Sequence, residues 1–304
     1  MYQILCIIGN GFDRHHGLKT SYLDYFHFLE KNYPDVLGNI GSSKFFNGAY
    51  CSVKPKKNDI FWTELEKNLE YAYEEHFEET IFTYAPDLTA EHPDFGAIIN
   101  RVGDGMSPFF RFTGELLVKW IKSIDIGKCK RDDDLFLPLS ASYLNFNYTS
   151  TLQTIYGIDD HQILHIHGSL QDVLKNDGIL QFGNPAVSAE RLQRHLEYGY
   201  AEHACGSWGT DAIPAMIDLC KALTKNLNQN YECLKRFLQS KQFDEVVVMG
   251  HSFMGVDKPY YDDILVPYLE KCKWTFYVYD DKNKRDVSDF RRLHPAIYVA
   301  EKKW

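Results

Sequence analysis

The stretch Leu5–Leu18, which reads LCIIGNGFDRHHGL, indicates the fold of the chain. A short apolar run stops at Gly9, and such a run bounded by glycine is typical of a strand buried on both faces of a parallel sheet. Gly9 and Gly11 stand one residue apart, so the backbone can turn tightly and present bare N–H groups to an anion. A helix after this turn would direct its positive end at the same point, which favours a phosphate. A tight strand–helix turn without a ligand explains the same residues equally well.

The glycine spacing argues against a nicotinamide dehydrogenase. The dinucleotide-binding fingerprint G-x-G-x-x-G has a third glycine, and Arg14 occupies that position here. The turn therefore predicts a nucleotide site of another kind.

Composition narrows the class of protein. The chain has 304 residues, 44% of them hydrophobic, which is enough for a large core. The net charge of −9 argues against a broad nucleic-acid surface. The seven cysteines form no C-x-x-C pair, so a structural zinc site is disfavoured and reduced thiols are expected. No stretch of about 18 apolar residues occurs. We expect a cytoplasmic protein that crosses no membrane.

Strand-like runs recur along the chain with helical patterns between them, which favours parallel pairing. The sequence predicts an α/β fold, a Rossmann-like parallel sheet of about six strands flanked by helices. Residues 1–19 and 135–304 would form the core, with a helical segment at 189–240, and residues 20–134 a mostly helical insertion after the first strand. The expected strands are Ile4–Ile8, Leu135–Phe146, Gln162–Ile166, Glu245–Met249, Trp274–Tyr279 and Ala296–Ala300.

Apolar residues spaced by threes and fours predict the helices. The first of them has Thr20 and Ser21 as candidate caps. A region rich in Gly, Ser, Asn and Lys, residues 38–57, is typical of a loop. The expected helices are 20–33, 59–82, 109–124, 150–156 and 259–271.

Four of the predicted strands end in small polar motifs. In open parallel α/β sheets, ligands bind beyond the carboxyl ends of the strands, so four such motifs predict one small-molecule site. The motifs are Gly9-Asn10-Gly11, Asn147-Tyr148-Thr149, His167-Gly168-Ser169 and Gly250-His251-Ser252.

His167 is the most capable proton-transfer group of the four motifs, because imidazole titrates near neutral pH. His165 lies two residues earlier on the strand, so its side chain would face the same way. We interpret His165 as a packed, hydrogen-bonded residue. Two histidines could also hold a metal, but no carboxylate ligand accompanies them, and no metal is expected.

Asn147 offers an acceptor and a donor that could orient a ribose hydroxyl or a water. An Asx turn or a helix cap explains the residue as well, and Thr149 and Ser150 could cap the next helix equally. No serine or cysteine lies in a G-x-S-x-G pattern, which disfavours covalent acyl chemistry.

These motifs together resemble a known family. IIGNGFDRHHGL followed by TSY, then FNYTSTL, HIHGSL and a late GHSF are similar to the AbiH family of bacteriophage abortive-infection proteins. The ordered motifs cover almost the whole chain, and WTELEKNL at Trp62–Leu69 is similar to a segment of that family. The resemblance implies a role in antiviral defence.

The same order resembles, more distantly, the sirtuin-type NAD-binding fold. That resemblance implies that Gly9 and Gly11 hold a pyrophosphate, Asn147 contacts the nicotinamide ribose and His167 acts as a base. Gly250 and Ser252 would bind the adenosine side. Neighbouring residues of the motifs complete the expected nucleotide contacts: Asn10, Asp13, Gly168, Ser169 and His251.

Three departures from the sirtuin pattern matter. Asn10 replaces an alanine and Asp13 stands where serine is usual, Tyr148-Thr149 follows Asn147 in place of an aspartate, and the four-cysteine zinc module is missing. The missing module argues against protein deacylation, and sirtuin-like defence proteins without it are associated with NAD hydrolysis.

The leading hypothesis is an antiphage effector that hydrolyses NAD to nicotinamide and ADP-ribose. Asn147 and His167 would be catalytic, and Asp13 could stabilise positive charge on the ribose, although a cap at a helix N-terminus is the interpretation we favour for Asp13. The alternative is a non-catalytic nucleotide sensor that triggers a defence partner. A nuclease is disfavoured by the acidic balance. A homo-oligomer or a phage-derived trigger would fit either hypothesis.

Overall fold

The computed structural model describes residues 2–42, 62, 64–68, 111–135, 137–176, 180–185, 194, 217, 221 and 224–304. The chain forms two compact units. The first comprises Met1–Ser21, Ile121–Leu180 and Asn226–Trp304, and the second comprises Tyr22–Trp120 and Gln181–Lys225.

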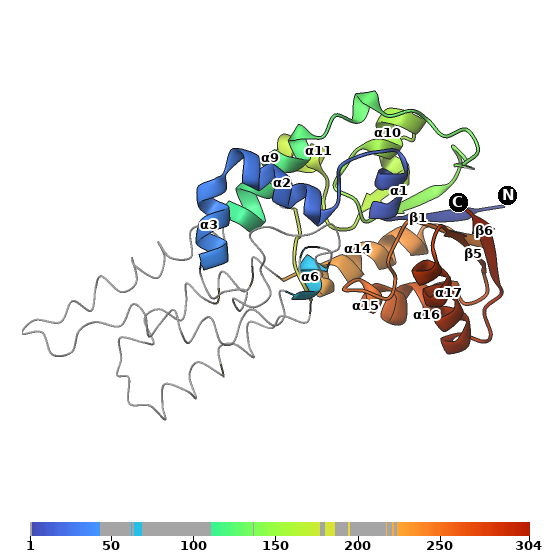
Figure 1. Ribbon diagram of the computed structural model, residues 1–304. Coiled ribbons are helices and arrows are strands. Elements are labelled where there is room, and N and C mark those ends of the chain that lie inside the picture. Colours follow the sequence, from blue (N-terminus) through green and yellow to red (C-terminus); the bar gives the residue numbers. More distant parts are fainter. Residues whose placement is uncertain are drawn as a thin grey trace, which may run out of the picture. The chain divides into compact units, whose positions relative to one another are not determined.

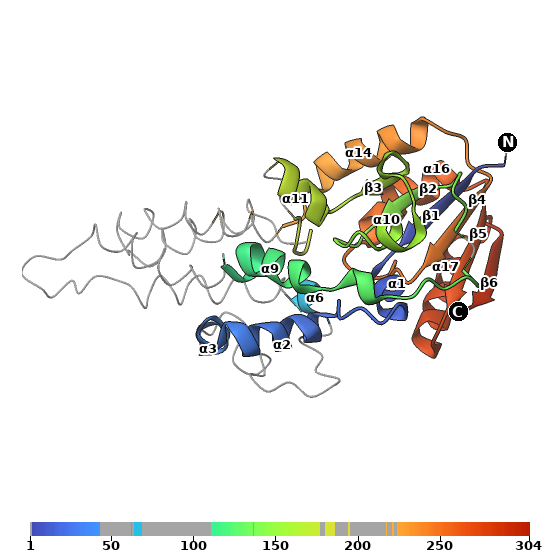
Figure 2. The same ribbon diagram turned by 90° about the horizontal axis from the view of Figure 1, so that it is seen from above.

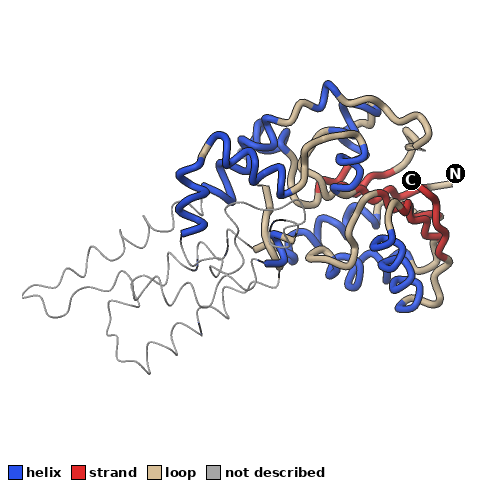
Figure 3. The backbone as a smooth tube through the Cα atoms, in the orientation of Figure 1, coloured by secondary structure: helices blue, strands red, loops and turns tan. Residues whose placement is uncertain are grey.

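The first unit contains one open sheet of six parallel strands (Figures 1 and 3). Their order is β3-β2-β1-β4-β5-β6, so the direction of winding reverses between β1 and β4. This sheet confirms the predicted α/β, Rossmann-like fold. The strands are β1 (Ile4–Ile8), β2 (Ser142–Asn145), β3 (Ile163–His165), β4 (Glu245–Met249), β5 (Lys273–Val278) and β6 (Val299–Lys303).

Helices cover both faces of the sheet, as the fully buried β1 requires. Because side chains alternate along a strand, Leu5 and Ile7 join the core on one face while Cys6 and Ile8 join the core on the other. The first face packs on three helical segments (Figure 1). They are α14 (Leu227–Gln239), the run formed by α15 (Lys258–Tyr260), η5 (Tyr261–Leu265) and α16 (Val266–Leu269), and α17 (Asp281–Leu293). The second face packs on α1 (Asn10–His15) and α10 (Thr151–Tyr156), the side from which Figure 2 views the sheet.

Several short elements complete the first unit. Gly157 ends α10 in the left-handed conformation, with φ of +68°, as the predicted helix 150–156 requires. The predicted helix 259–271 is confirmed as a continuous run with a π-helical middle. These elements are η3 (Ile126–Lys128), η4 (Asp160–Gln162), α11 (Leu170–Asn176), α15 (Lys258–Tyr260), η5 (Tyr261–Leu265) and α16 (Val266–Leu269).

Two strands differ clearly from their expected bounds, and one helix was missed. β2 begins at Ser142 rather than Leu135, because the preceding segment contains Pro138, which lacks a ladder N–H. β6 lies three residues later than expected. The helix α17 was not predicted, since its core contact rests mainly on Val287 and Phe290 within a strongly charged sequence.

The described secondary-structure elements of the second unit are all helices, whereas residues 181–185, 224 and 225 form loops. The predicted helices 20–33 and 109–124 are confirmed, while most of 59–82 lies outside the described residues. Helix α3 extends to Ser42, so the predicted loop cannot begin at Gly38. The described elements are α2 (Tyr22–Asn32), α3 (Pro34–Ser42), α6 (Leu65–Asn68), η2 (Arg111–Glu115) and α9 (Leu116–Ser123), the last of which continues into the first unit.

Aromatic stacking and a buried ion pair stabilise this second unit. The ring of Tyr25 stacks on Phe112 and Trp120, with centroids 5.2 and 4.9 Å apart. Lys225 Nζ lies 3.2 Å from Glu66 Oε2, and the lysine side chain is 2% exposed. Burial of this kind makes an ion pair costly to remove, because charges in a low-dielectric interior are poorly solvated.

Candidate functional site

The four polar motifs meet at the carboxyl edge of the sheet. They follow β1, β2, β3 and β4, which are consecutive in the strand order β3-β2-β1-β4. Direct contacts join them: Asn147 Nδ2 donates to Gly9 O at 3.1 Å, and Gly11 N donates to Gly250 O at 2.8 Å. The edge includes the β1/β4 reversal, the point at which α/β sheets of this order bind ligands.

The Gly9-Asn10-Gly11 turn packs against the end of β4. A Cβ on Gly9 would lie 2.5 Å from Cα of His251, and a Cβ on Gly250 would lie 2.2 Å from the backbone nitrogen of Phe12. Gly250 also has a φ of +64°, a left-handed conformation that residues other than glycine rarely adopt. Close approach of two backbones therefore requires glycine at these positions.

The N–H groups of both glycines in this turn are already used within the chain. Gly9 N donates to Met249 O at 3.0 Å, and the Gly11 N–H donates to Gly250 as described. The prediction that both glycines present bare N–H groups to an anion is therefore wrong. The turn instead ties β1 to β4.

Asn147 links β2 to this turn. Its side-chain amide donates to Gly9 O at 3.1 Å. Its backbone N–H donates to Asn145 Oδ1 at 3.0 Å, so Asn145 forms the local Asx-type contact. Asn147 is thus neither the Asx residue nor the cap of α10, and its side chain is 7% exposed at the edge.

Asp13 is a buried acid and not the helix cap that the sequence analysis favoured. It lies inside α1, whose N-cap is Gly9, and is only 1% exposed. Thr149 Oγ1 and Thr151 Oγ1 donate to its carboxyl oxygens at 2.5 and 2.8 Å. Both oxygens therefore hold the segment after β2, which does not favour a role beside a charged ribose.

Burial raises the pKa of Asp13 to about 6, although the hydrogen bonds from Thr149, Thr151 and Asn147 oppose the shift. Between its ordinary pKa of 3.8 and about 6, the folded protein holds a proton that the unfolded chain has lost. The free energy of unfolding therefore falls as the pH rises through this window. Two pKa units correspond to a loss of about 3 kcal/mol.

We expect Asp13→Asn to remove this pH dependence. The amide has nearly the same shape and stays neutral, so the variant gains stability relative to the wild type as the pH rises from 4 to 6. Urea unfolding of both proteins at several pH values measures the difference. A difference in unfolding free energy that stays constant across the window would contradict the assignment of the raised pKa.

His165 is a packed, hydrogen-bonded residue, as expected. Its Nδ1 donates to Asn147 O at 3.0 Å and its Nε2 accepts from Gln153 Nε2 at 3.1 Å, which fits a neutral ring. Burial lowers its pKa. The side chains of His165 and His167 were expected to point to the same side of one strand. That expectation is wrong, because β3 ends at His165 and His167 lies in the following turn.

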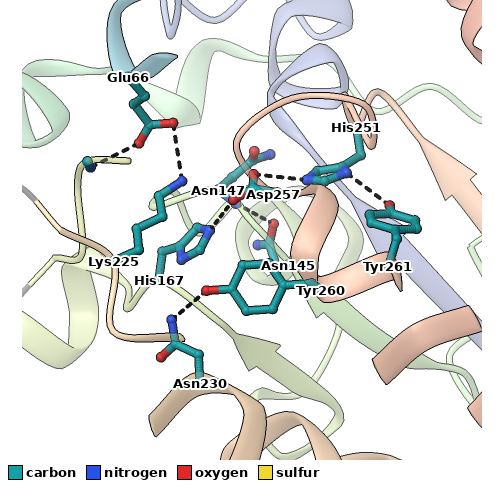
Figure 4. Close-up of polar contacts among 11 residues, drawn as sticks. Glu66, Asn145, Asn147, His167, Lys225, Asn230, His251, Asp257, Tyr260 and Tyr261 are labelled. Atoms are coloured by element: carbon teal, nitrogen blue, oxygen red, sulfur yellow. Dashed lines mark hydrogen bonds and ion pairs between the residues drawn. The ribbon is translucent and has the colours of Figure 1, made fainter. Parts of the chain in front are cut away.

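His167 belongs to a buried chain of polar side chains (Figure 4). Its Nε2 lies 3.1 Å from Asp257 Oδ1, and the other carboxylate oxygen lies 3.4 Å from Nε2 of His251. His251 Nδ1 in turn lies 2.9 Å from the hydroxyl of Tyr261. The side chains of both histidines are at most 4% exposed, and that of Asp257 is 14% exposed.

Aromatic rings enclose this chain of contacts. The ring of Phe146 lies 3.9 Å from that of His251 and 5.4 Å from that of His167, measured between centroids. Tyr260 packs on His167 from another side at 5.6 Å, and its hydroxyl accepts from Asn230 Nδ2 at 2.7 Å. The low-dielectric surroundings strengthen the ionic contacts to Asp257.

The remaining predicted contact residues divide into structural and exposed ones. Gly168, with φ of +82°, turns the chain after β3, and Ser169 caps α11 by exchanging hydrogen bonds with Asp172. Asn10 and Ser252 are exposed at the carboxyl ends of the adjacent strands β1 and β4. These two are the predicted residues best placed to meet a solute.

Sequence reasoning missed Asp257. The residue belongs to no strand-end motif, and it reaches both histidines from the turn that follows Gly250-His251-Ser252. A carboxylate a few residues after a predicted histidine motif is the one signal in the sequence that could have indicated it.

Within the described part of the chain, no group of three or more His, Cys, Asp or Glu side chains is arranged to hold a metal ion. The cysteines described there, Cys6, Cys129, Cys233 and Cys272, are free thiols. None of the described helices has the length and apolar character needed to traverse a bilayer.

The fold and the edge define a Rossmann-like α/β protein with a polar site at the strand reversal. The family model described as "Bacteriophage abortive infection AbiH" matches residues 5–278, so the chain belongs to the AbiH family. Membership implies a function in abortive infection by phage. No curated protein and no solved structure matched the chain in the corresponding comparisons. The likeness to sirtuins therefore has no support from these comparisons.

Proposed function

We propose that this AbiH protein acts in abortive infection by hydrolysing NAD to nicotinamide and ADP-ribose. The observation that carries the proposal is the buried His167–Asp257 pair at the carboxyl edge of a parallel sheet with a Rossmann strand order. That order binds dinucleotides where the winding reverses, and an imidazole beside a carboxylate is a competent general base.

The reaction replaces one bond at the ribose C1′ atom by another. The bond from C1′ to the nicotinamide nitrogen breaks, and nicotinamide leaves as a neutral molecule because its ring nitrogen is cationic in NAD. A water oxygen bonds to C1′, and one water proton passes to His167 and then to solvent. The transition state has oxocarbenium character, as in other glycosidic cleavages.

Asn147 is the second catalytic residue in the proposal. Its Nδ2 donates to Gly9 O at 3.1 Å, which fixes the orientation of the amide. Its Oδ1 can then accept a hydrogen bond from the attacking water or a ribose hydroxyl. A preorganised contact of this kind contributes without reorganisation during the reaction.

The pyrophosphate contacts must differ from those of a glycine-rich loop. Because Gly9 and Gly11 use their N–H groups within the chain, we assign the pyrophosphate side to the exposed Asn10 and Ser252. Gly250 and His251 pack against the Gly9-Asn10-Gly11 turn and so stabilise this edge of the sheet.

The burial of His167 favours a second candidate function. A base only 2% exposed is enclosed by the protein, which would also suit a non-catalytic sensor that binds a nucleotide and signals to a partner. A sensor and an enzyme would both bind the nucleotide, but only the enzyme would convert it to product.

Purified protein separates the two functions. We would measure NAD binding by calorimetry and nicotinamide release by chromatography for the wild type, Asn147→Ala and His167→Ala. Hydrolysis predicts nicotinamide release by the wild type only. Saturable binding without release would identify the sensor. A protein that neither binds NAD nor releases nicotinamide would contradict both functions.

A further inference from the structure

We infer that Asp257 is a positioning residue that holds the ring of His167 with its proton on Nε2. In this arrangement Tyr261 donates to His251, and His251 in turn directs its Nε2 hydrogen at Asp257. The inference rests on the proposed function in one respect, which is that His167 acts as the base. The tautomer itself follows from the contacts alone.

The carboxylate of Asp257 bridges two imidazoles. One oxygen lies 3.1 Å from Nε2 of His167 and the other 3.4 Å from Nε2 of His251. An ionised carboxylate only accepts hydrogen bonds. Nε2 of His167, which hydrogen-bonds the carboxylate, must therefore carry the hydrogen, and Nδ1 of a neutral His167 is the basic nitrogen.

The hydroxyl of Tyr261 determines which nitrogen of His251 carries the hydrogen. Burial raises the pKa of Tyr261 well above its usual value, so the hydroxyl keeps its proton. That hydroxyl lies 2.9 Å from His251 Nδ1 and is the donor of the pair, because a buried hydroxyl that does not donate loses a hydrogen bond. His251 then carries its own hydrogen on Nε2, directed at Asp257.

The arrangement has a chemical consequence for His167. When Nδ1 takes up a proton, the positive charge of the ring lies beside the Asp257 carboxylate, which stabilises it. Phe146 and Tyr260 pack on the ring at 5.4 and 5.6 Å and restrict its rotation. Asp257 thus acts on the reaction through His167 without contacting the substrate.

The first test is Asp257→Asn. An asparagine has one acceptor oxygen and a donor NH2 group, so it cannot accept from both imidazoles, and one ring must change tautomer. We expect kcat for NAD hydrolysis to fall by about 10²–10⁴, with KM little changed. Adding Asp257→Asn to His167→Ala should cause no further loss, because the two residues act as a unit.

Asp262→Asn is the matched control. The change is chemically identical and lies five residues further on, where Asp262 pairs with Lys258 and is 41% exposed. It should leave kcat unchanged. Near-ultraviolet circular dichroism of each variant checks that the fold persists. An Asp257→Asn protein that is folded and has the kcat of the wild type would overturn the inference.

The second test does not depend on NAD. In ¹⁵N spectra of the wild-type protein, recorded with neutral imidazoles and with His167 assigned by its loss in His167→Gln, we expect a protonated Nε2 and an unprotonated Nδ1. A proton on Nδ1 would overturn the inference. The expected pattern in a protein that releases no nicotinamide would instead refute the proposed hydrolysis and leave the role of Asp257 in place.

Discussion

Replacing His167 with alanine should lower the rate of NAD hydrolysis by about two to four orders of magnitude. This is the usual contribution of a general base, and the ring is held for that role by the 3.1 Å contact to Asp257. The loss should appear in kcat, because the proton transfer occurs only during the reaction. Nicotinamide release under saturating NAD measures it.

Two further variants make the result specific. His161→Ala removes an exposed imidazole from η4, just before β3, and should retain the activity of the wild type. His167→Gln retains most of the side-chain volume and guards against a packing defect at this buried position. Activity in folded His167→Ala or His167→Gln comparable to that of the wild type would remove His167 from the mechanism.

Gly250→Ala should destabilise the protein by about 3–5 kcal/mol, the sum of a left-handed backbone and a backbone clash. The added Cβ would stand 2.2 Å from Phe12 N and 2.5 Å from the carbonyl carbon of Gly11. Neither atom belongs to a flexible side chain, so β1 or β4 must shift. Urea unfolding of the variant and the wild type measures the loss.

Gly157→Ala separates the two contributions. Gly157 also has a positive φ, of +68°, but a Cβ there would meet nothing within 4 Å. Its cost should be only the backbone preference, about 1–2 kcal/mol. Equal losses at Gly157 and Gly250 would show that the close approach of the β1 turn to β4 has no energetic importance.

The sheet was predictable because buried parallel strands have a simple pattern. The predicted strands Ile4–Ile8 and Glu245–Met249, the second apolar after Glu245, are short and followed by glycine, and both match the observed strands. The pattern fails where the chain contributes little apolar surface. In α17 the cap at Asp280, which accepts from Asn283 N at 2.7 Å, starts a helix whose sequence is mostly charged.

The site was predictable only in its location. Parallel topology brings motifs at strand ends to one edge, which is how Asn147 and His167 could be selected. The roles of single residues depend on tertiary contacts that have no local signal. The Thr149 and Thr151 contacts to Asp13 and the Asp257 contact to His167 join segments 90 or more residues apart.

The glycine turn illustrates the same limit. Gly9 and Gly11 fit a phosphate-binding loop and a tight turn equally in sequence, because both need the same backbone freedom. The close approach of Gly250 favours the tight turn. The N–H groups of Gly9 and Gly11 donate to the carbonyl groups of Met249, the last residue of β4, and of Gly250. Both N–H groups are therefore committed to the tie between β1 and β4.

The measurement that tests the central claim most directly is the NAD content of bacteria that express this protein under an inducible promoter, with and without phage. Any activating factor can be present there. The account predicts that NAD falls before growth stops with the wild type and stays constant with His167→Ala. Growth arrest by the wild type with NAD unchanged would contradict it.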